Sequence, residues 1–354
     1  MTSKECSYQP VFQTIRGETV ESVHFGTIVI ANSQGDLIAW YGNPETVTFW
    51  RSTSKPFQAL PFIEKGGHKT FGMTPQEIAF ICASHSGTDT HFKVAKKLQQ
   101  KIGISEDALL CGTHSPFHKP TARLMADRGE HPTPNRHNCS GKHTGMLAYA
   151  KLENAPLDTY PEIKHPIQQN IIHSFSEMCS LDVDEIGIGI DGCSVPCFAT
   201  PMRNAAVAWA RLVDPQQLAP KRANACQTIT QAMVTHPNMV AGPGRFDTRL
   251  MEITQGKIVT KGGAEAYQGL GIPAGALGPN SQALGIVVKI SDGDASGRAK
   301  AAVVIETLKQ LNALTEQELT ALEKFGPTQI IHNHRGIIVG KGQPCFTLNF
   351  SGNG

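Results

Sequence analysis

Residues Phe49–Gly67 read FWRSTSKPFQALPFIEKGG, and the rest of the chain is interpreted outward from this stretch. A helix is expected to begin at Lys55, because a proline follows it at a position that helix starts favour. Ser52 lies three positions before Lys55, a spacing that brings the hydroxyl and the amine to one helical face. A serine becomes a nucleophile when a base takes its proton, and a lysine can be that base when burial or a nearby cation favours its neutral form. The stretch therefore predicts a Ser–Lys pair, with Arg51 as the adjoining cation.

The spacing also has an ordinary explanation, because about one S-x-x-K is expected by chance in a chain of this length, on a solvent-facing turn of helix. Serine β-lactamases and penicillin-binding proteins combine S-x-x-K with a downstream K-T-G strand. Lys261-Gly262-Gly263 is the candidate for that strand here. The pair gains weight only in company with the other motifs of the chain.

The composition predicts a compact soluble protein. Of 354 residues, 40% are hydrophobic and 18% are charged, and the net charge is +2. So small a charge, with no basic run interleaved with aromatic residues, argues against a nucleic-acid partner. The N-terminal residues lack a charged start followed by an apolar segment, and no stretch approaches the roughly 18 apolar residues of a membrane span. We therefore expect a cytoplasmic protein with no membrane partner.

The nine cysteines are an odd number without the spacing of a disulfide framework, which favours free thiols. Six of them stand outside any motif and are expected to be inert: Cys6, Cys82, Cys111, Cys179, Cys226 and Cys345.

Strand patterns occur at both ends of the chain and helical patterns lie between them. The expected strands are Val20–Ile30, Leu37–Tyr41, Val47–Trp50, Leu181–Asp191, Lys257–Lys261, Leu284–Ile290, Gly336–Gly340 and Cys345–Phe350. This order predicts an α/β (α+β) fold, in which an antiparallel sheet is built from about residues 1–70 and 240–354 and a mainly helical part spans about 71–239. We expect one catalytic domain over residues 1–354.

Two more polar motifs flank the helical part. Asn138–His143 (NCSGKH) opens a helical run, where backbone N–H groups converge and could bind an anion or a carbonyl oxygen. Asp191–Cys197 (DGCSVPC) is a turn that carries two thiols. A thiolate from each motif and a third ligand could hold zinc, although neither motif has a C-x-x-C pair. Ordinary buried thiols, or a cysteine nucleophile at Cys139, remain the alternatives.

Taken together, the motifs resemble those of the bacterial asparaginases of the Rhizobium etli thermolabile type, a family unrelated to the threonine-nucleophile bacterial asparaginases. The matching stretches follow the same order over most of the chain: Arg51–Pro56, Ala83–Gly87, Asn138–His143, Asp191–Pro196 and Lys261–Glu265. The resemblance implies a serine β-lactamase-like or penicillin-binding-protein-like fold, homodimers, and hydrolysis of L-asparagine to L-aspartate and ammonia.

The resemblance also implies roles for named residues. It implies two Ser–Lys pairs, Ser52 with Lys55 and Ser84 with Lys261. It further implies a zinc ion held by Cys139, Lys142 and Cys193, and a pocket lined by Arg51, His143 and Asp191, which we carry over as substrate-positioning residues. We favour Ser52 as the nucleophile and Lys55 as the base, while the choice between the two serines stays open. One departure is Asp247, where some members of the family have a cysteine.

Other functions remain open at this stage. One alternative is another serine amidohydrolase of the same fold, such as a glutaminase or a β-lactamase-like enzyme. Glutamine differs from asparagine by one methylene, which a pocket discriminates by only a few kcal/mol. A second is a zinc-binding or amino-acid-binding protein without turnover. Release of ammonia from an amide separates the enzyme from the binding protein.

Overall fold

The computed structural model describes residues 8–352, which form two compact units. Unit 1 combines the two ends of the chain, up to Thr53 and from Ile253 onward, with Thr200–Asp214. Unit 2 comprises Ser54–Ala199 and Pro215–Glu252. Cys6, expected to be an inert thiol, lies outside the described residues.

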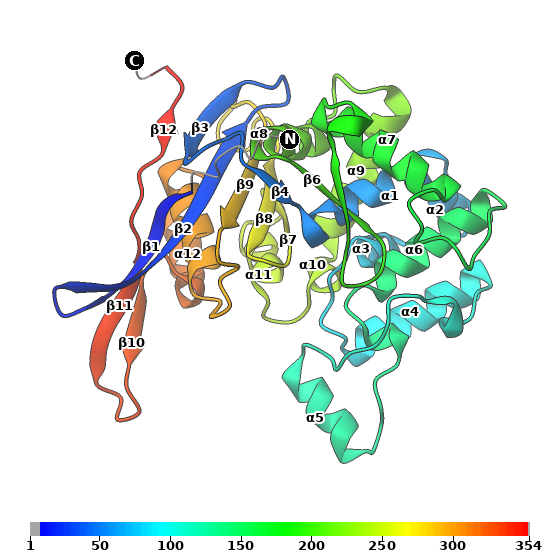
Figure 1. The fold of residues 1–354 in the computed structure, drawn as a ribbon, viewed down its shortest axis with the longest axis horizontal. Coiled ribbons are helices and arrows are strands. Elements are labelled where there is room, and N and C mark those ends of the chain that lie inside the picture. The colour runs from blue at the N-terminus through cyan, green and yellow to red at the C-terminus, as the bar shows by residue number, and fades with distance from the viewer. Residues whose placement is uncertain (1–7, 353–354) are drawn as a thin grey trace. The chain divides into compact units, whose positions relative to one another are not determined.

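Unit 1 is built on an antiparallel sheet, in which neighbouring strands follow the order β10-β11-β1-β2-β9-β8-β7 and β3 pairs with β2 and β12 (Figure 1). The expected strands Val20–Ile30 and Leu37–Tyr41 correspond to β2 and β3, which pair as an antiparallel hairpin with Ile28 opposite Tyr41. The strands of unit 1 are β1 (Gln9–Arg16), β2 (Thr19–Ala31), β3 (Leu37–Tyr41), β4 (Val47–Phe49), β7 (Val259–Gly262), β8 (Tyr267–Ile272), β9 (Leu284–Ile290), β10 (Gln329–His332), β11 (Ile338–Pro344) and β12 (Asn349–Phe350).

Helices pack on this sheet where its strands carry small residues. Helix α8 (Met202–Val213) packs on β2, β8 and β9, and α12 (Ala299–Gln310) packs on β1, β9 and β11. A Cβ atom on Gly285 would lie 1.8 Å from the Ala206 carbonyl oxygen. Glycine in these strands therefore permits the close approach of α8. The remaining helical elements of unit 1 are α13 (Glu316–Ala321) and a 3-10 turn, η5 (Glu323–Phe325).

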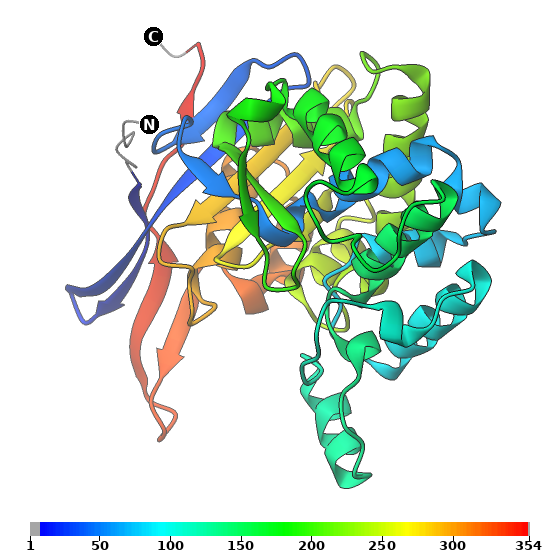
Figure 2. The ribbon, with the colours of Figure 1, turned by 45° about the vertical axis from the view of Figure 1, so that its right-hand side comes forward.

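Unit 2 is mainly helical. Its elements are α1 (Lys55–Glu64), α2 (Gly67–Thr70), α3 (Pro75–Ile81), α4 (Asp89–Ile102), α5 (Lys119–Asp127), α6 (Ser140–Leu152), α7 (Pro166–Cys179), α9 (Pro220–Thr235), α10 (Pro237–Val240), most of α11 (Phe246–Ile253), the 3-10 turns η2 (Glu106–Ala108), η3 (Pro134–Arg136) and η4 (Val183–Glu185), and the paired strands β5 (Gly187–Ile190) and β6 (Pro196–Pro201, to Ala199 in this unit). In both views α5 projects from the rest of unit 2 (Figures 1 and 2).

Helix α6 is the centre of unit 2. Every residue from Ser140 to Ala150 is buried, so the helix has no solvent-facing polar side. It packs against α3, and a Cβ atom on Gly141 would lie 2.0 Å from the Phe80 carbonyl oxygen. Because Lys142 and His143 lie on this buried helix, their polar groups are held in the interior, where such groups usually serve function.

Helix α3 begins with a capping box between Thr74 and Glu77. The helix ends at Ile81, and Ser84 lies in the loop that follows. The backbone N–H of Ser84 donates to the Val240 carbonyl oxygen, 2.9 Å away, and this bond fixes the loop that carries the serine.

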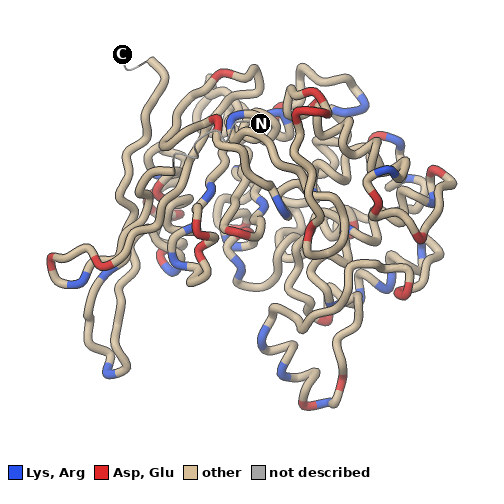
Figure 3. The backbone as a smooth tube through the Cα atoms, in the orientation of Figure 1, with Lys and Arg blue, Asp and Glu red and all other residues tan. Residues whose placement is uncertain are grey.

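Acidic and basic residues are interspersed along both units (Figure 3), and the formal net charge of the chain is +2. In residues 8–352, no helix combines the length and the apolar character needed to cross a membrane.

The predicted α+β fold is confirmed, with an antiparallel sheet from both chain ends and a mainly helical region between them. Three segments differ from the expected division. Thr200–Asp214 lies within the predicted helical region but belongs to unit 1, because α8 covers the sheet, whereas residues 54–70 and 240–252 were expected in the sheet part and belong to unit 2. That the chain is one catalytic domain stays a prediction.

Candidate active site

Three predicted site residues meet in the interior of unit 2. Lys55, at the start of α1, places its Nζ 3.0 Å from Ser84 Oγ and 3.2 Å from Cys139 Sγ. The same amine donates to the Ala83 carbonyl oxygen at 2.5 Å. Only 1% of Lys55, 8% of Ser84 and 4% of Cys139 is exposed. A buried amine between a hydroxyl and a thiol can exchange protons with either group.

The zinc ligands implied by the resemblance also meet in this unit. Lys142 Nζ lies 2.9 Å from Cys193 Sγ, and the thiols of Cys193 and Cys139 are hydrogen-bonded to each other. This bond from Cys193, with the charges of Lys55 and Lys142, holds the pKa of Cys139 well below its usual range despite burial. The bond raises the pKa of Cys193, as does burial. Of the two thiols, Cys139 is therefore the one that loses its proton more readily.

Lys142 is held in its charged form. Burial by itself would lower the pKa of Lys142, but Cys193 and Cys139 outweigh burial and raise it. A negative charge on the neighbouring thiols compensates the desolvation of the buried amine. The two thiols therefore favour the charged form of Lys142.

Asp191 and Cys193 are presented by the turn between β5 and β6. The Asp191 N–H donates to the Val195 carbonyl oxygen at 2.9 Å, and Cys193 Sγ lies 3.7 Å from Asp191 Oδ2. Ser194 follows in the left-handed region at φ 76°. A non-glycine residue in that region costs free energy, and such residues gather at functional sites. The turn thus brings the predicted substrate-positioning carboxylate to the thiol cluster.

His143 follows Lys142 on α6 and none of its surface is exposed. Its Nδ1 lies 2.5 Å from the hydroxyl of Tyr160. Burial lowers the pKa of His143 to about 4, against a smaller opposing effect of the neighbouring Cys193. The imidazole is therefore neutral at neutral pH.

Unit 1 holds the remaining predicted residues. Arg51 has φ 52°, a strained conformation, immediately before Ser52, which is 9% exposed in the 3-10 turn η1 (Arg51–Ser54). Lys261 on β7 is 1% exposed and donates to the Gly262 carbonyl oxygen at 2.5 Å.

Glycine brings the Ser52 turn and the Lys261 strand together within unit 1. A Cβ atom on Gly263 would lie 2.8 Å from the Trp50 carbonyl oxygen and 3.5 Å from Arg51 Cβ. The indole of Trp50 in turn donates to Thr200 Oγ1 at 2.8 Å and stacks on Tyr267. The lysine-glycine-glycine motif predicted from the sequence is thus the segment on which the Ser52 turn packs.

Two expected pairs span the division into units and stay predictions: Ser52 with Lys55, and Ser84 with Lys261. The hydrogen bond from Lys55 to Ser84 and the contact between Lys55 and Cys139 were not expected from the sequence. Tyr160 was also missed, because a tyrosine in a loop carries no motif. Asp247, the departure from the family pattern, is a buried residue of α11.

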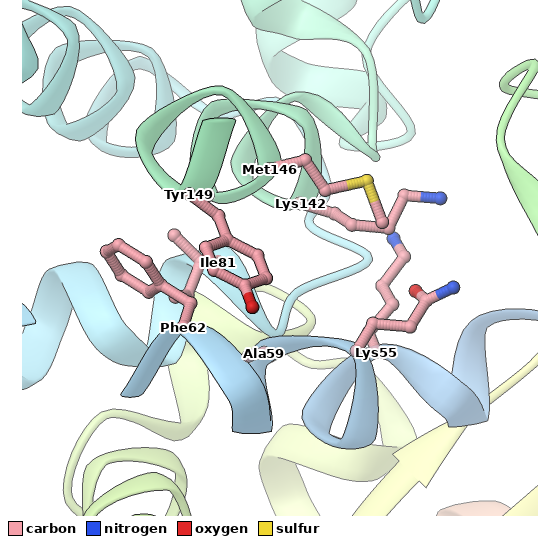
Figure 4. Close-up of a pocket in the computed structure, with 9 residues that line it drawn as sticks. Lys55, Ala59, Phe62, Ile81, Lys142, Met146 and Tyr149 are labelled. Atoms are coloured by element: carbon pink, nitrogen blue, oxygen red, sulfur yellow. The ribbon is translucent and has the colours of Figure 1, made fainter. Parts of the chain in front are cut away.

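A small cavity lies between α1 and α6, and the side chains of Lys55 and Lys142 reach the same end of it (Figure 4). Its volume is about 10 Å³, enough for one water molecule at most. Met146 and Phe62 are among its apolar lining residues. The cavity is too small for an amino acid and is not a substrate pocket.

The donor set fits zinc on chemical grounds. Residues 8–352 contain no group of three or more His, Cys, Asp and Glu side chains placed to hold a metal. The implied set differs in kind, because its third donor is a lysine beside two thiols. Thiolates suit zinc, and binding would require Lys142 and Cys193 to give up their protons.

The chain is similar both to a protein family and to solved structures. The family model of L-asparaginase II matches residues 12–344. No curated protein matches the chain. Among solved structures, the chain is similar to a probable glutaminase from Bacillus subtilis complexed with 6-diazo-5-oxo-L-norleucine, with 12% identity, a TM-score of 0.39, and coverage of 81% of this chain and 84% of that chain. A Bacillus glutaminase shows 11% identity and a TM-score of 0.38, with 81% and 91% covered.

Proposed function

This chain belongs to the L-asparaginase II family, and we propose that it hydrolyses the side-chain amide of L-asparagine to give L-aspartate and ammonia through a Ser–Lys nucleophile. The family makes the chain an amidohydrolase that acts on an amide substrate. The observation that carries the proposal is the contact of Lys55 with Ser84 and Cys139 in the interior of unit 2. A lysine held among a hydroxyl and a thiol supports proton transfer at that amine.

In the proposed reaction, Ser52 Oγ attacks the amide carbon while Lys55, in its neutral form, accepts the proton of the hydroxyl. The tetrahedral oxyanion needs hydrogen-bond donors, and the departing ammonia needs a proton. Ser84 and Lys261 complete the relay: Lys55 passes its proton to Ser84 Oγ across 3.0 Å while the hydrogen of Ser84 moves to the amide nitrogen. The C–N bond then breaks, so that ammonia leaves and the acyl group stays on Ser52. Water then releases aspartate by the reverse proton path.

Arg51, His143 and Asp191 are proposed to orient the substrate. An α-amino acid presents one carboxylate and one ammonium group, which a guanidinium and a carboxylate match in charge. His143 is neutral, so it acts as a hydrogen-bond partner rather than as a cation.

Zinc would be held by Cys139, Lys142 and Cys193. When bound, it would supply a positive charge and an open coordination position near the substrate carboxylate. This chain would supply two thiols and one amine as donors, and all three are buried and lie together.

Ammonia release from the purified protein tests the proposal, with L-asparagine, L-glutamine and β-aspartyl compounds offered side by side. We expect L-asparagine to be turned over with the highest kcat/KM. Faster turnover of glutamine would make the protein a glutaminase, and no ammonia from any amide would favour the binding protein without turnover.

The homodimer and the cytoplasmic location implied by the resemblance belong to the same proposal. Light scattering of the purified protein tests the dimer, which predicts twice the 38.2 kDa mass of the chain. A monomer at working concentration would remove the dimer from the proposal without touching the chemistry.

A further inference from the structure

The two residues that follow Ser84 and Cys139 in the chain are hydrogen-bonded to each other. His85 comes after Ser84, and Ser140 comes after Cys139. His85 Nε2 lies 2.9 Å from Ser140 Oγ, and neither residue has any exposed surface. This bond therefore links the loop that carries Ser84 to the start of α6.

The direction of the bond follows from the neighbours of both groups. The backbone N–H of Gly87 donates to His85 Nδ1 at 3.1 Å, so this nitrogen carries no hydrogen. An imidazole with a bare Nδ1 has its hydrogen on Nε2, which therefore donates to Ser140. Ser140 Oγ in turn donates to the Asn135 carbonyl oxygen at 3.1 Å. Every donor in this series of bonds has its acceptor, and all of them lie in unit 2.

Further contacts fix the orientation of His85. Its ring stacks on Phe80, with centroids 5.0 Å apart and an interplanar angle of 26°, and on His91, with values of 4.8 Å and 16°. Its backbone N–H donates to the Asn138 carbonyl oxygen at 3.2 Å. The side chain and the backbone of His85 thus bind the same turn before α6. Such support from packing and hydrogen bonds is what holds reacting groups in place.

Lys55 depends on the separation of these two segments. Its Nζ lies 3.0 Å from Ser84 Oγ and 3.2 Å from Cys139 Sγ. Ser84 lies in a loop and Cys139 in a turn, so no regular element sets the distance between them. A misplacement of 1 Å can cost a reaction about 10²-fold. The bond between His85 and Ser140 restrains this distance from the next residue of each segment.

We propose that His85 is a positioning residue, whose hydrogen bond to Ser140 holds Ser84 and Cys139 at the separation that keeps both within hydrogen-bond distance of Lys55. The consequence for turnover rests on the proposed function. The geometric role does not, because it concerns contacts that exist without substrate.

Two substitutions separate the bond to Ser140 from the other contacts of His85. His85→Gln keeps a side-chain N–H donor near the place of Nε2 and removes the acceptor for Gly87. His85→Asn keeps that acceptor and removes the donor to Ser140. We expect His85→Asn to lower kcat for ammonia release about 10- to 100-fold with little change in KM, whereas His85→Gln keeps most of the wild-type kcat. Equal losses in the two variants would overturn the proposal.

Ser140→Ala tests the other end of the bond by removing one oxygen atom. It should lower kcat as His85→Asn does. The double variant should be no slower than either single variant, because each change removes the same bond. Losses that multiply in the double variant would overturn the coupling. If His85→Asn does not fold, the comparison of Ser140→Ala with the wild type decides.

His165→Asn is the matched control. His165 is also buried, its Nδ1 accepts the backbone N–H of Ile167 at 3.3 Å, and its Nε2 lies 2.9 Å from the Pro156 carbonyl oxygen. This similar set of bonds caps α7 instead of supporting Ser84. The control should lose stability and keep its kcat. A fall in kcat equal to that of His85→Asn would assign the loss to general destabilisation and overturn the proposal.

Crystal structures of the variants test the geometry without substrate. We expect the distance from Lys55 Nζ to Ser84 Oγ to exceed the normal hydrogen-bond limit of about 3.2 Å in His85→Asn and Ser140→Ala. It should stay near 3.0 Å in His85→Gln. An unchanged distance in the first two variants would overturn the positioning role even in an active asparaginase. Failure of the wild type to release ammonia would overturn the proposed function and leave this distance to decide the role of His85.

Discussion

Lys55 Nζ lies 3.0 Å from Ser84 Oγ, and both side chains are buried in unit 2. The lysine favoured as the partner of Ser52 is therefore in contact with the second predicted serine. In the proposed mechanism the same amine therefore exchanges protons with both serine hydroxyls. Replacing each serine in turn distinguishes their roles.

We predict that Ser52→Ala lowers kcat by at least about 10⁴-fold, because it removes the attacking atom. Ser84→Ala should lower it by about 10²–10⁴-fold, the range for loss of a proton-transfer group. Both are measured as ammonia release in a single turnover. Ser86→Ala is the matched control, since this hydroxyl in the same loop bonds the Ala241 carbonyl oxygen at 2.7 Å and contacts neither lysine. A larger loss in Ser84→Ala than in Ser52→Ala would reverse the two roles.

Replacing Cys139 and Cys193 together by serine should remove zinc and weaken substrate binding, because two of three proposed ligands are lost. Thermal unfolding should change only modestly, because the proposed metal serves the site rather than the fold. Elemental analysis of the purified protein measures zinc. Cys226→Ser is the control: this thiol is also buried, its pKa is raised to about 12 by burial, and it lies on α9. Zinc-free wild-type protein with full activity would reject the metal site.

Gly141→Ala should destabilise unit 2 and reduce activity. Its new methyl group would lie 2.0 Å from the Phe80 carbonyl oxygen, so α6 and α3 must move apart. Overpacking of this kind costs about 1–3 kcal/mol, and backbone against backbone belongs at the upper end. Denaturant unfolding gives the value. Gly192→Ala is the control, because a Cβ there meets nothing within 4 Å. Equal stability of both variants would contradict the close packing.

Because His91 is buried, we expect the free energy of unfolding to fall at acid pH. Burial lowers its pKa to about 4, and its Nε2 lies 2.9 Å from the Asn238 carbonyl oxygen. Between pH 6.5 and pH 4 the unfolded chain binds a proton at this residue and the folded chain does not. The free energy of unfolding should therefore fall as pH decreases through that window, by roughly 3 kcal/mol from this residue. In His91→Gln the pH dependence should be shallower by that amount when unfolding in denaturant is compared at both pH values. An unchanged slope would assign the acid sensitivity elsewhere.

The sequence predicted those parts of the fold whose patterns are local. Strand β9 and the β2–β3 hairpin follow from runs of β-branched residues and a polar turn. Strand β8, YQGLGI, was missed because glycine is disfavoured in strands. Its reason is tertiary: a Cβ on Gly269 would lie 2.1 Å from the Trp209 side chain, so the glycine makes room for α8. The residue pattern within one segment does not indicate which other element packs on it.

The same contrast between local patterns and tertiary contacts applies to the site. Each motif could be located in the sequence, and the resemblance named the residues that act together. The contact between Lys55 and Cys139 could not be found from spacing, because Lys55 begins α1 and Cys139 lies in the turn before α6, far away in the chain. Nor could the contacts of Tyr160, whose hydroxyl is hydrogen-bonded to both Leu110 and His143.

The interleaved order of the two units has a consequence for how the protein is made. Unit 2 is fully synthesised once Glu252 has left the ribosome, whereas β2 must wait for β9, where Gly26 pairs with Ile290, and β3 must wait for Phe350. The end of β2, from Gly26 to Ala31, is entirely buried in the finished sheet. The first strands to emerge are thus among the last to be completed. Until their partners are made, their unpaired edges and apolar side chains stay accessible to other nascent chains.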